Sequence, residues 1–123
     1  MAWISQAGAS PKFSAPYLPL ATTTSVTNVA VTAVGNDVFG KVTMVVTGTV
    51  AQGVVATIVP PVALPAAAVV VISPANSQTA LGGIATTIGW FGSVNSSGNI
   101  AIGTGMTISS ALSTAIVNYF VGL

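Results

Sequence analysis

The chain has 123 residues, of which only three carry a charged side chain: Lys12, Asp37 and Lys41. It contains no Glu, Arg, His or Cys, and 52% of its residues are hydrophobic. These counts exclude imidazole bases, paired carboxylates and thiolate metal sites, so we expect no enzyme activity, no metal and no cofactor. The net charge of +1 also argues against a nucleic-acid partner, because phosphates are bound by several cations together.

The scarcity of charge also bears on partners. An average soluble domain is about one quarter Asp, Glu, Lys and Arg, which would give a chain of this length roughly thirty charges. Three charges cannot keep the surface of a free monomer in solution by repulsion and hydration. We therefore expect much of the surface to be covered by other copies of the chain or by another protein. The alternative is a monomer that its many Ser, Thr, Asn and Gln side chains keep soluble.

Residues 1–22 differ from the rest of the chain because prolines alternate with large apolar side chains. Proline fixes its own φ angle and moves the preceding residue toward extended conformations. Pro11, Pro16 and Pro19 therefore predict an extended N-terminal arm that is neither a helix nor an inner strand. The arm is expected to anchor on a neighbouring molecule, or on its own domain, through five side chains: Trp3, Ile4, Phe13, Tyr17 and Leu18.

Residues 23–123 are rich in Val, Ile and Thr, whose branched side chains suit a packed, pleated surface. Turn residues divide this region into short apolar runs, which predicts an all-β domain, an antiparallel β-sandwich or jelly roll of about seven strands. Residues 41–47 alternate clearly, with Val42, Met44 and Val46 expected on the buried face. The predicted strands are Val26–Val34, Gly40–Gly48, Val54–Val59, Ala67–Ile72, Ala85–Val94, Asn99–Ile102 and Ser113–Val121.

Residues 54–72 are apolar apart from Thr57, which raises the question of a membrane span. Pro60, Pro61 and Pro65 lie inside this stretch, and each removes a helical hydrogen-bond donor and clashes with the preceding turn. A continuous spanning helix is therefore not expected. The stretch is better interpreted as two buried strands with a proline-stiffened connection, and we expect no membrane partner.

Few residues remain that could carry chemistry. Asp37 and Lys41 lie four positions apart across a turn that contains Gly40, and they are expected to form a solvated pair of little energetic weight. The adjacent aromatic residues Trp90–Phe91 and Tyr119–Phe120 are expected to serve the core or a subunit contact. The alternative for these aromatic pairs is a site where sugars stack.

Several segments of residues 22–123 are similar to sequences of a known protein family. They are Ala-Thr-Ile at 56–58, Pro-Ala-Ala-Ala-Val-Val-Val-Ile-Ser-Pro-Ala-Asn at 65–76, Gly-Ser-Val-Asn-Ser-Ser-Gly-Asn-Ile at 92–100 and Asn-Tyr-Phe-Val-Gly at 118–122. Together they resemble a small β-domain that is common in structural proteins of tailed bacteriophages. Family members occur as capsid decoration proteins and tail-fibre modules, often as trimers, and the resemblance implies no catalytic residues. The arm at residues 1–22 is not part of this pattern.

These observations lead to one main hypothesis. The chain is expected to be a non-enzymatic virion structural protein, a capsid decoration (cement) subunit that stabilises the phage head through apolar subunit contacts and its N-terminal arm. Its expected partners are the major capsid protein and other copies of itself, as a homotrimer. The expected location is the capsid surface of the virion, after synthesis in the host cytoplasm. The alternatives are a tail-fibre or receptor-binding tip module and a filament subunit whose arm completes the sheet of the next subunit.

Overall fold

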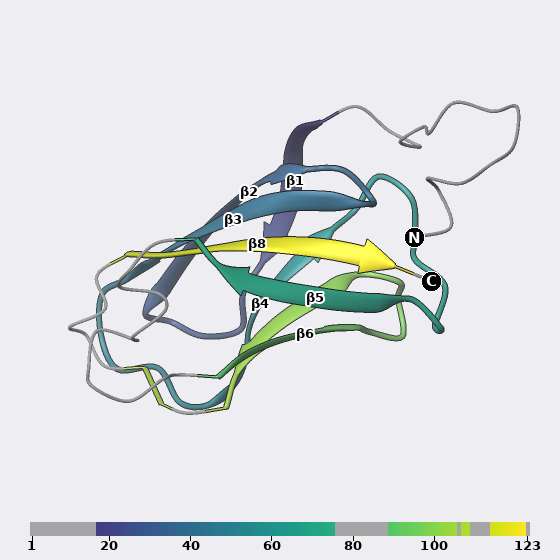
Figure 1. Ribbon diagram of the computed structural model, residues 1–123. Coiled ribbons are helices and arrows are strands. Elements are labelled where there is room, and N and C mark those ends of the chain that lie inside the picture. Colours follow the sequence, from purple (N-terminus) through teal and green to yellow (C-terminus); the bar gives the residue numbers. More distant parts are fainter. Residues whose placement is uncertain (1–16, 76–88, 106, 109–113, 123) are drawn as a thin grey trace, which may run out of the picture.

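The computed structural model describes residues 17–75, 89–105, 107–108 and 114–122 (Figure 1). These residues form strands joined by turns and loops, and every strand pair is antiparallel. The predicted all-β, antiparallel class is therefore confirmed. The strands are β1 (Leu18–Thr23), β2 (Val29–Gly35), β3 (Phe39–Val46), β4 (Gly53–Val59), β5 (Val69–Pro74), β6 (Trp90–Val94), β7 (Ile100–Thr104) and β8 (Thr114–Gly122).

The strands form a single sheet in the order β5-β8-β3-β2-β1-β4-β7-β6. The sheet curls until its two edge strands, β5 and β6, lie against each other, which gives a nearly closed, barrel-like shape (Figure 1). A sandwich or jelly roll of seven strands is not confirmed. The two edges approach closely at Gly92, where an added Cβ would lie 2.7 Å from Val70 Cγ1 and 2.8 Å from Ile72 Cγ1. The absence of a side chain at Gly92 therefore lets β5 pack against β6.

All seven predicted strands correspond to observed strands, with ends shifted by a few residues. For the predicted strand Ala85–Val94, the beginning is not tested, because residues 85–88 lie outside the described residues. Strand β1 is additional: residues 18–22 were predicted to be part of the arm and not an inner strand, yet they lie in the sheet between β2 and β4. That part of the prediction is wrong, whereas residues 1–16 of the predicted arm lie outside the described residues.

Strand β1 changes its partner halfway along its length. Leu18 to Leu20 pair with β2, whereas Ala21 to Thr23 pair with β4. At the change, the Thr22 hydroxyl donates a 3.1 Å hydrogen bond to the backbone oxygen of Val31 in β2. Pro19 is tolerated in β1 because residues 18–20 have a partner strand on one side only, as on a sheet edge. The prolines predicted that this segment would not be an inner strand, but one-sided pairing allows Pro19 to lie in the sheet.

The core lies on the inner face of the curled sheet. Val42, Met44 and Val46 in β3 are buried, so the predicted alternation of this strand is confirmed. Strand β8 alternates in the same way, and Tyr119 is its largest buried side chain. Because successive side chains of a strand point to opposite faces, the intervening residues of β3 and β8 lie on the outer face.

Candidate interaction surface

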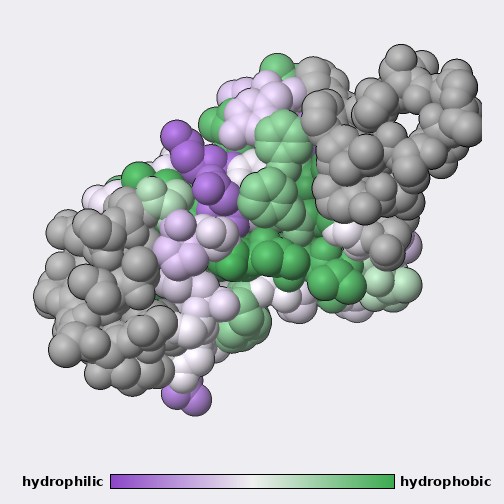
Figure 2. Space-filling view, viewed as in Figure 1, coloured by the Kyte–Doolittle hydropathy of each residue, from purple (hydrophilic) through white to green (hydrophobic). Residues whose placement is uncertain are grey.

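An aromatic row crosses the outer face at one end of the sheet. The register places Phe39 of β3 directly opposite Phe120 of β8, and Phe120 opposite Val71 of β5. The ring of Tyr17, just before β1, continues the row, with its centroid 5.3 Å from that of Phe39. Tyr17, Phe120 and Val71 are 46%, 47% and 56% exposed. We call these four residues the aromatic row. Figure 2 shows hydrophobic side chains gathered over β8 and β5.

A polar row lies next to the aromatic row on the same face. Lys41 pairs with Asn118 on one side and with Val34 on the other, and Asn118 pairs with Ser73. Lys41 is exposed and is the only lysine or arginine among the described residues. The outer face therefore has an apolar strip bordered by a single positive charge, an arrangement that suits a protein contact more than contact with solvent.

Tyr119 fixes the corner beneath the aromatic row. Its ring lies where a Cβ on Gly40 would be, and its hydroxyl occupies the corresponding space at Gly35. The hydroxyl donates a 2.6 Å hydrogen bond to the backbone oxygen of Asn36. Burial raises the pKa of Tyr119 well above its ordinary value, and the nearby Tyr17 and Asp37 add to the shift. The hydroxyl therefore remains a protonated donor at every physiological pH.

The turn between β2 and β3 is held from several sides. The Asn36 Oδ1 oxygen accepts hydrogen bonds from the backbone N–H groups of Val38 and Phe39, at 2.9 and 3.0 Å. Because the Asn36 side chain accepts both amides, the Tyr119 hydroxyl can donate to the Asn36 backbone carbonyl in place of them. The Val121 N–H also donates to the Val38 oxygen at 2.7 Å, which ties the turn to β8. These bonds fix Phe39 in its position at the centre of the aromatic row.

Asp37 lies in the same turn and is the only carboxylate in the chain. Its Oδ1 oxygen is buried and has no hydrogen-bond partner. The solvated pair predicted with Lys41 does not describe this oxygen, since a solvated carboxylate oxygen would be satisfied by water. A buried carboxylate oxygen without a donor is costly, so this turn carries an unsatisfied acceptor.

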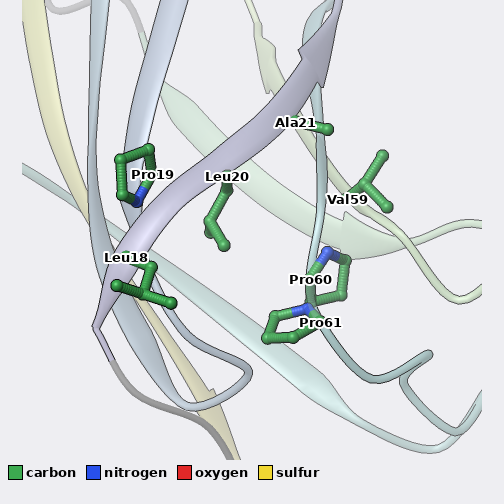
Figure 3. A pocket seen from close by; sticks show the side chains of 7 residues that line it. All are labelled: Leu18, Pro19, Leu20, Ala21, Val59, Pro60 and Pro61. Atoms are coloured by element: carbon green, nitrogen blue, oxygen red, sulfur yellow. The ribbon is translucent and has the colours of Figure 1, made fainter.

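A second apolar feature is a groove of about 300 Å³ between β1 and β4 (Figure 3). The β1–β4 ladder ends at the pair Ala21 and Val59, and the residues that follow Val59 are Pro60 and Pro61, which have no N–H to continue it. The two strands therefore separate. None of the lining residues is ionisable, so the groove can hold an apolar group but offers no acid or base. The lining residues are Leu18, Pro19, Leu20, Ala21, Val59, Pro60 and Pro61.

The structure places two of the five predicted arm anchors. Tyr17 lies in the aromatic row, whereas Leu18 lines the groove, so the two adjacent side chains serve different surfaces. Trp3, Ile4 and Phe13 lie outside the described residues. Sequence reasoning missed Phe39, Val71 and the environment of Asp37. The alternation in β3 would have placed Phe39 on the outer face with Lys41, but the register between distant strands was needed to find the row.

Neither aromatic pair forms a joint platform for sugars. Trp90 packs against the core, whereas Phe91 is 42% exposed on the other face of β6. Tyr119 and Phe120 likewise lie on opposite faces of β8. Adjacent residues in a strand point in opposite directions, so each pair can present only one ring to a ligand.

Among the described residues, no group of three or more Asp, Glu, His and Cys residues could hold a metal ion. The described part of the chain contains no helix that is long and apolar enough to cross a membrane. The chain matches no family model, and no curated protein and no solved structure matches it either.

Proposed function

We propose that the chain is a non-enzymatic structural subunit of a permanent assembly, in the form of a capsid decoration (cement) subunit on the head of a tailed phage. The observation that carries the proposal is the aromatic row, an apolar strip left exposed on a molecule with three charged side chains. Covering one large apolar side chain contributes on the order of 1.5–3 kcal/mol. Tyr17, Phe120 and Val71 are about half exposed and Phe39 is less exposed, so covering the row gains part of that free energy at each side chain, which favours contact with another protein.

The contact surface is well suited to a repeated, rigid interface. Phe39 is held by the hydrogen-bonded turn, and Phe120 and Val71 are held by ladders on both sides of β8. Such a surface loses little conformational entropy when it is covered, so more of the burial energy is retained as affinity. This property supports a scaffold role, in which the same contact is made many times over a shell.

The assignment to a virion is supported by the resemblance of residues 22–123 to small β-domains of tailed-phage structural proteins. From that resemblance come the homotrimer, the major capsid protein as partner and the capsid surface as location. A two-layered sandwich or jelly roll was expected from the number and spacing of the predicted strands. The proposal does not depend on it, because a curled sheet presents the aromatic row equally well.

Shell binding tests the proposed function. The full chain is mixed with phage shells that lack it, and occupancy is compared between the wild type, Val71→Ser and Val45→Ser. Val45 is the matched control, since it is an exposed valine of β3 on the outer face but outside the aromatic row. We expect Val71→Ser to lower occupancy and Val45→Ser to preserve it. Absence of wild-type binding to any shell would contradict the decoration role.

A further inference from the structure

A polar pocket lies beyond the end of β3 that is farther from Phe39. It has a volume of about 250 Å³ and lies between the loop that joins β1 to β2 and the loop that joins β3 to β4. We infer that this pocket binds a single neutral sugar unit. This binding function goes beyond the proposed contact with a shell and uses a different part of the molecule from the aromatic row.

Hydrogen bonds hold both loops in place, so the pocket is formed before any ligand arrives. The Asn28 side chain donates a 2.9 Å hydrogen bond from Nδ2 to the backbone oxygen of Thr49, which joins the two loops directly. The Thr47 N–H donates to the backbone oxygen of Asn28 at 2.9 Å. The Thr24 hydroxyl donates a 2.7 Å bond to the backbone oxygen of Val55 in β4. A preformed site loses little conformational entropy when it binds a ligand.

Gly48 provides the space for the amide that joins the loops. A Cβ at Gly48 would lie 2.7 Å from Asn28 Nδ2, so any other residue at this position would displace the amide. Asn28 itself lines the pocket, and its link to Thr49 fixes the orientation of its amide there. One wall of the pocket therefore depends on a glycine and an asparagine from different loops.

The lining combines hydroxyl groups with apolar side chains and contains no ionisable group. Ser25, Thr27 and Thr49 line the pocket and are exposed to solvent. Each hydroxyl can donate one hydrogen bond and accept others, which suits a ligand that also both donates and accepts. Val26 and Val50 add an apolar part to the lining. A few polar groups on a partly apolar, concave surface are typical of small-molecule sites.

A neutral sugar unit has the matching chemistry, because its ring carries hydroxyls on the rim and C–H groups on the faces. An anionic ligand would find no cation at the pocket. Lys41, the one lysine or arginine in the described part of the chain, lies six residues before Thr47, roughly 20 Å along the extended chain. The volume lies just below the range of roughly 300–1,000 Å³ for drug-sized ligands, which favours one sugar unit over an oligosaccharide.

Amide NMR spectra of the full-length protein test the inference. The methyl glycosides of glucose, galactose, mannose and N-acetylglucosamine serve as neutral probes, and glucose 6-phosphate serves as the charged comparison. We expect at least one neutral probe to shift the amide signals of residues 25–28 and 49–51. Its Kd should be on the order of 1 mM, the scale for a ligand of about a dozen non-hydrogen atoms. Glucose 6-phosphate should bind no more tightly than that probe.

Two valine variants test the role of the hydroxyls. Thr27→Val and Thr49→Val keep the shape of the side chain and remove its hydroxyl. Each should weaken binding of the probe by about fivefold, the scale of one hydrogen bond. Thr32→Val is the matched control, since Thr32 is an exposed threonine in the middle of β2 and does not line the pocket. The dispersion of the amide signals checks that each variant is folded.

Three results would overturn the inference. They are no shift of the pocket amides with any neutral probe, tighter binding of glucose 6-phosphate than of every neutral probe, and wild-type affinity in both pocket variants. An equal loss of affinity in Thr32→Val would also overturn it, because the effect would not be specific to the pocket. Shell occupancy is measured separately, so its failure would refute the proposed function and leave the sugar result intact.

Discussion

Tyr119 and Phe120 are neighbours in β8 with opposite surroundings. Tyr119 is 0% exposed, and its hydroxyl completes the turn that begins at Asn36. Phe120 is 47% exposed and lies between Phe39 and Val71 on the outer face. One strand can therefore stabilise the fold through the side chains of its inner face and leave those of its outer face available for contact with another molecule. Aromatic content alone therefore says nothing about role until the face is known.

The largest expected effect is a difference in unfolding free energy between alanine variants of Tyr119 and Phe120. Tyr119→Ala should lower the free energy of unfolding by about 3–5 kcal/mol, because it leaves a cavity in the core. Phe120→Ala should lower it by no more than about 1 kcal/mol, because the half-exposed ring loses only its cross-strand contacts with Phe39 and Val71. Urea denaturation of the full chain measures both values. Equal losses for the two variants would break the comparison.

The next effect concerns the packing of the Tyr119 ring against the backbone at Gly40 on the inner face. Gly40→Ala is expected to destabilise the protein by about 1–3 kcal/mol, because the new methyl group would overlap the Tyr119 ring. Gly122→Ala is the matched control at the C-terminal end of β8, where an added Cβ meets no atom within 4 Å. Thermal unfolding of both variants reports the difference. A tolerated Gly40→Ala would mean that Tyr119 does not pack over this backbone.

A smaller effect concerns the Tyr119 hydroxyl. Tyr119→Phe should cost about 1 kcal/mol through loss of the bond to Asn36. Because the folded state raises the pKa of Tyr119 above the unfolded value of 10.0, the unfolded state releases this proton first as pH rises. The stabilisation is therefore complete below about pH 10 and decreases above it.

Unfolding measured between pH 8 and pH 11 tests this sign, with values chosen around the ordinary tyrosine pKa of about 10. The wild type should lose stability over the upper part of the range, and Tyr119→Phe should lose less. Parallel curves for the two proteins would show that Tyr119 does not contribute to the pH dependence.

The sequence predicted local features well and long-range features poorly. The alternation predicted for β3 was correct, because the buried and exposed sides of a strand follow from the order of consecutive residues. Strand β1 was missed because its prolines argue against an inner strand, and only the positions of β2 and β4 show that half of it has one open side. The aromatic row joins residues 17, 39, 71 and 120, and no local pattern reveals that these positions meet.

The same distinction applies to Asp37. From the sequence it was a carboxylate in a turn near Lys41, which predicts a solvated pair. In the structure, its Oδ1 oxygen is buried and has no hydrogen-bond partner. Burial at such a corner depends on tertiary packing, so turn propensity alone could not predict it.

The central claim is that the outer face of β8 is covered by other protein in the working state. Sedimentation velocity of the full-length wild type and Phe120→Ser, over a wide range of concentration, tests it most directly. We predict that the wild type sediments as an oligomer and that Phe120→Ser shifts toward the monomer while its circular dichroism spectrum stays that of the folded protein. A wild type that remains monomeric at every concentration, or an unchanged Phe120→Ser, would contradict the claim.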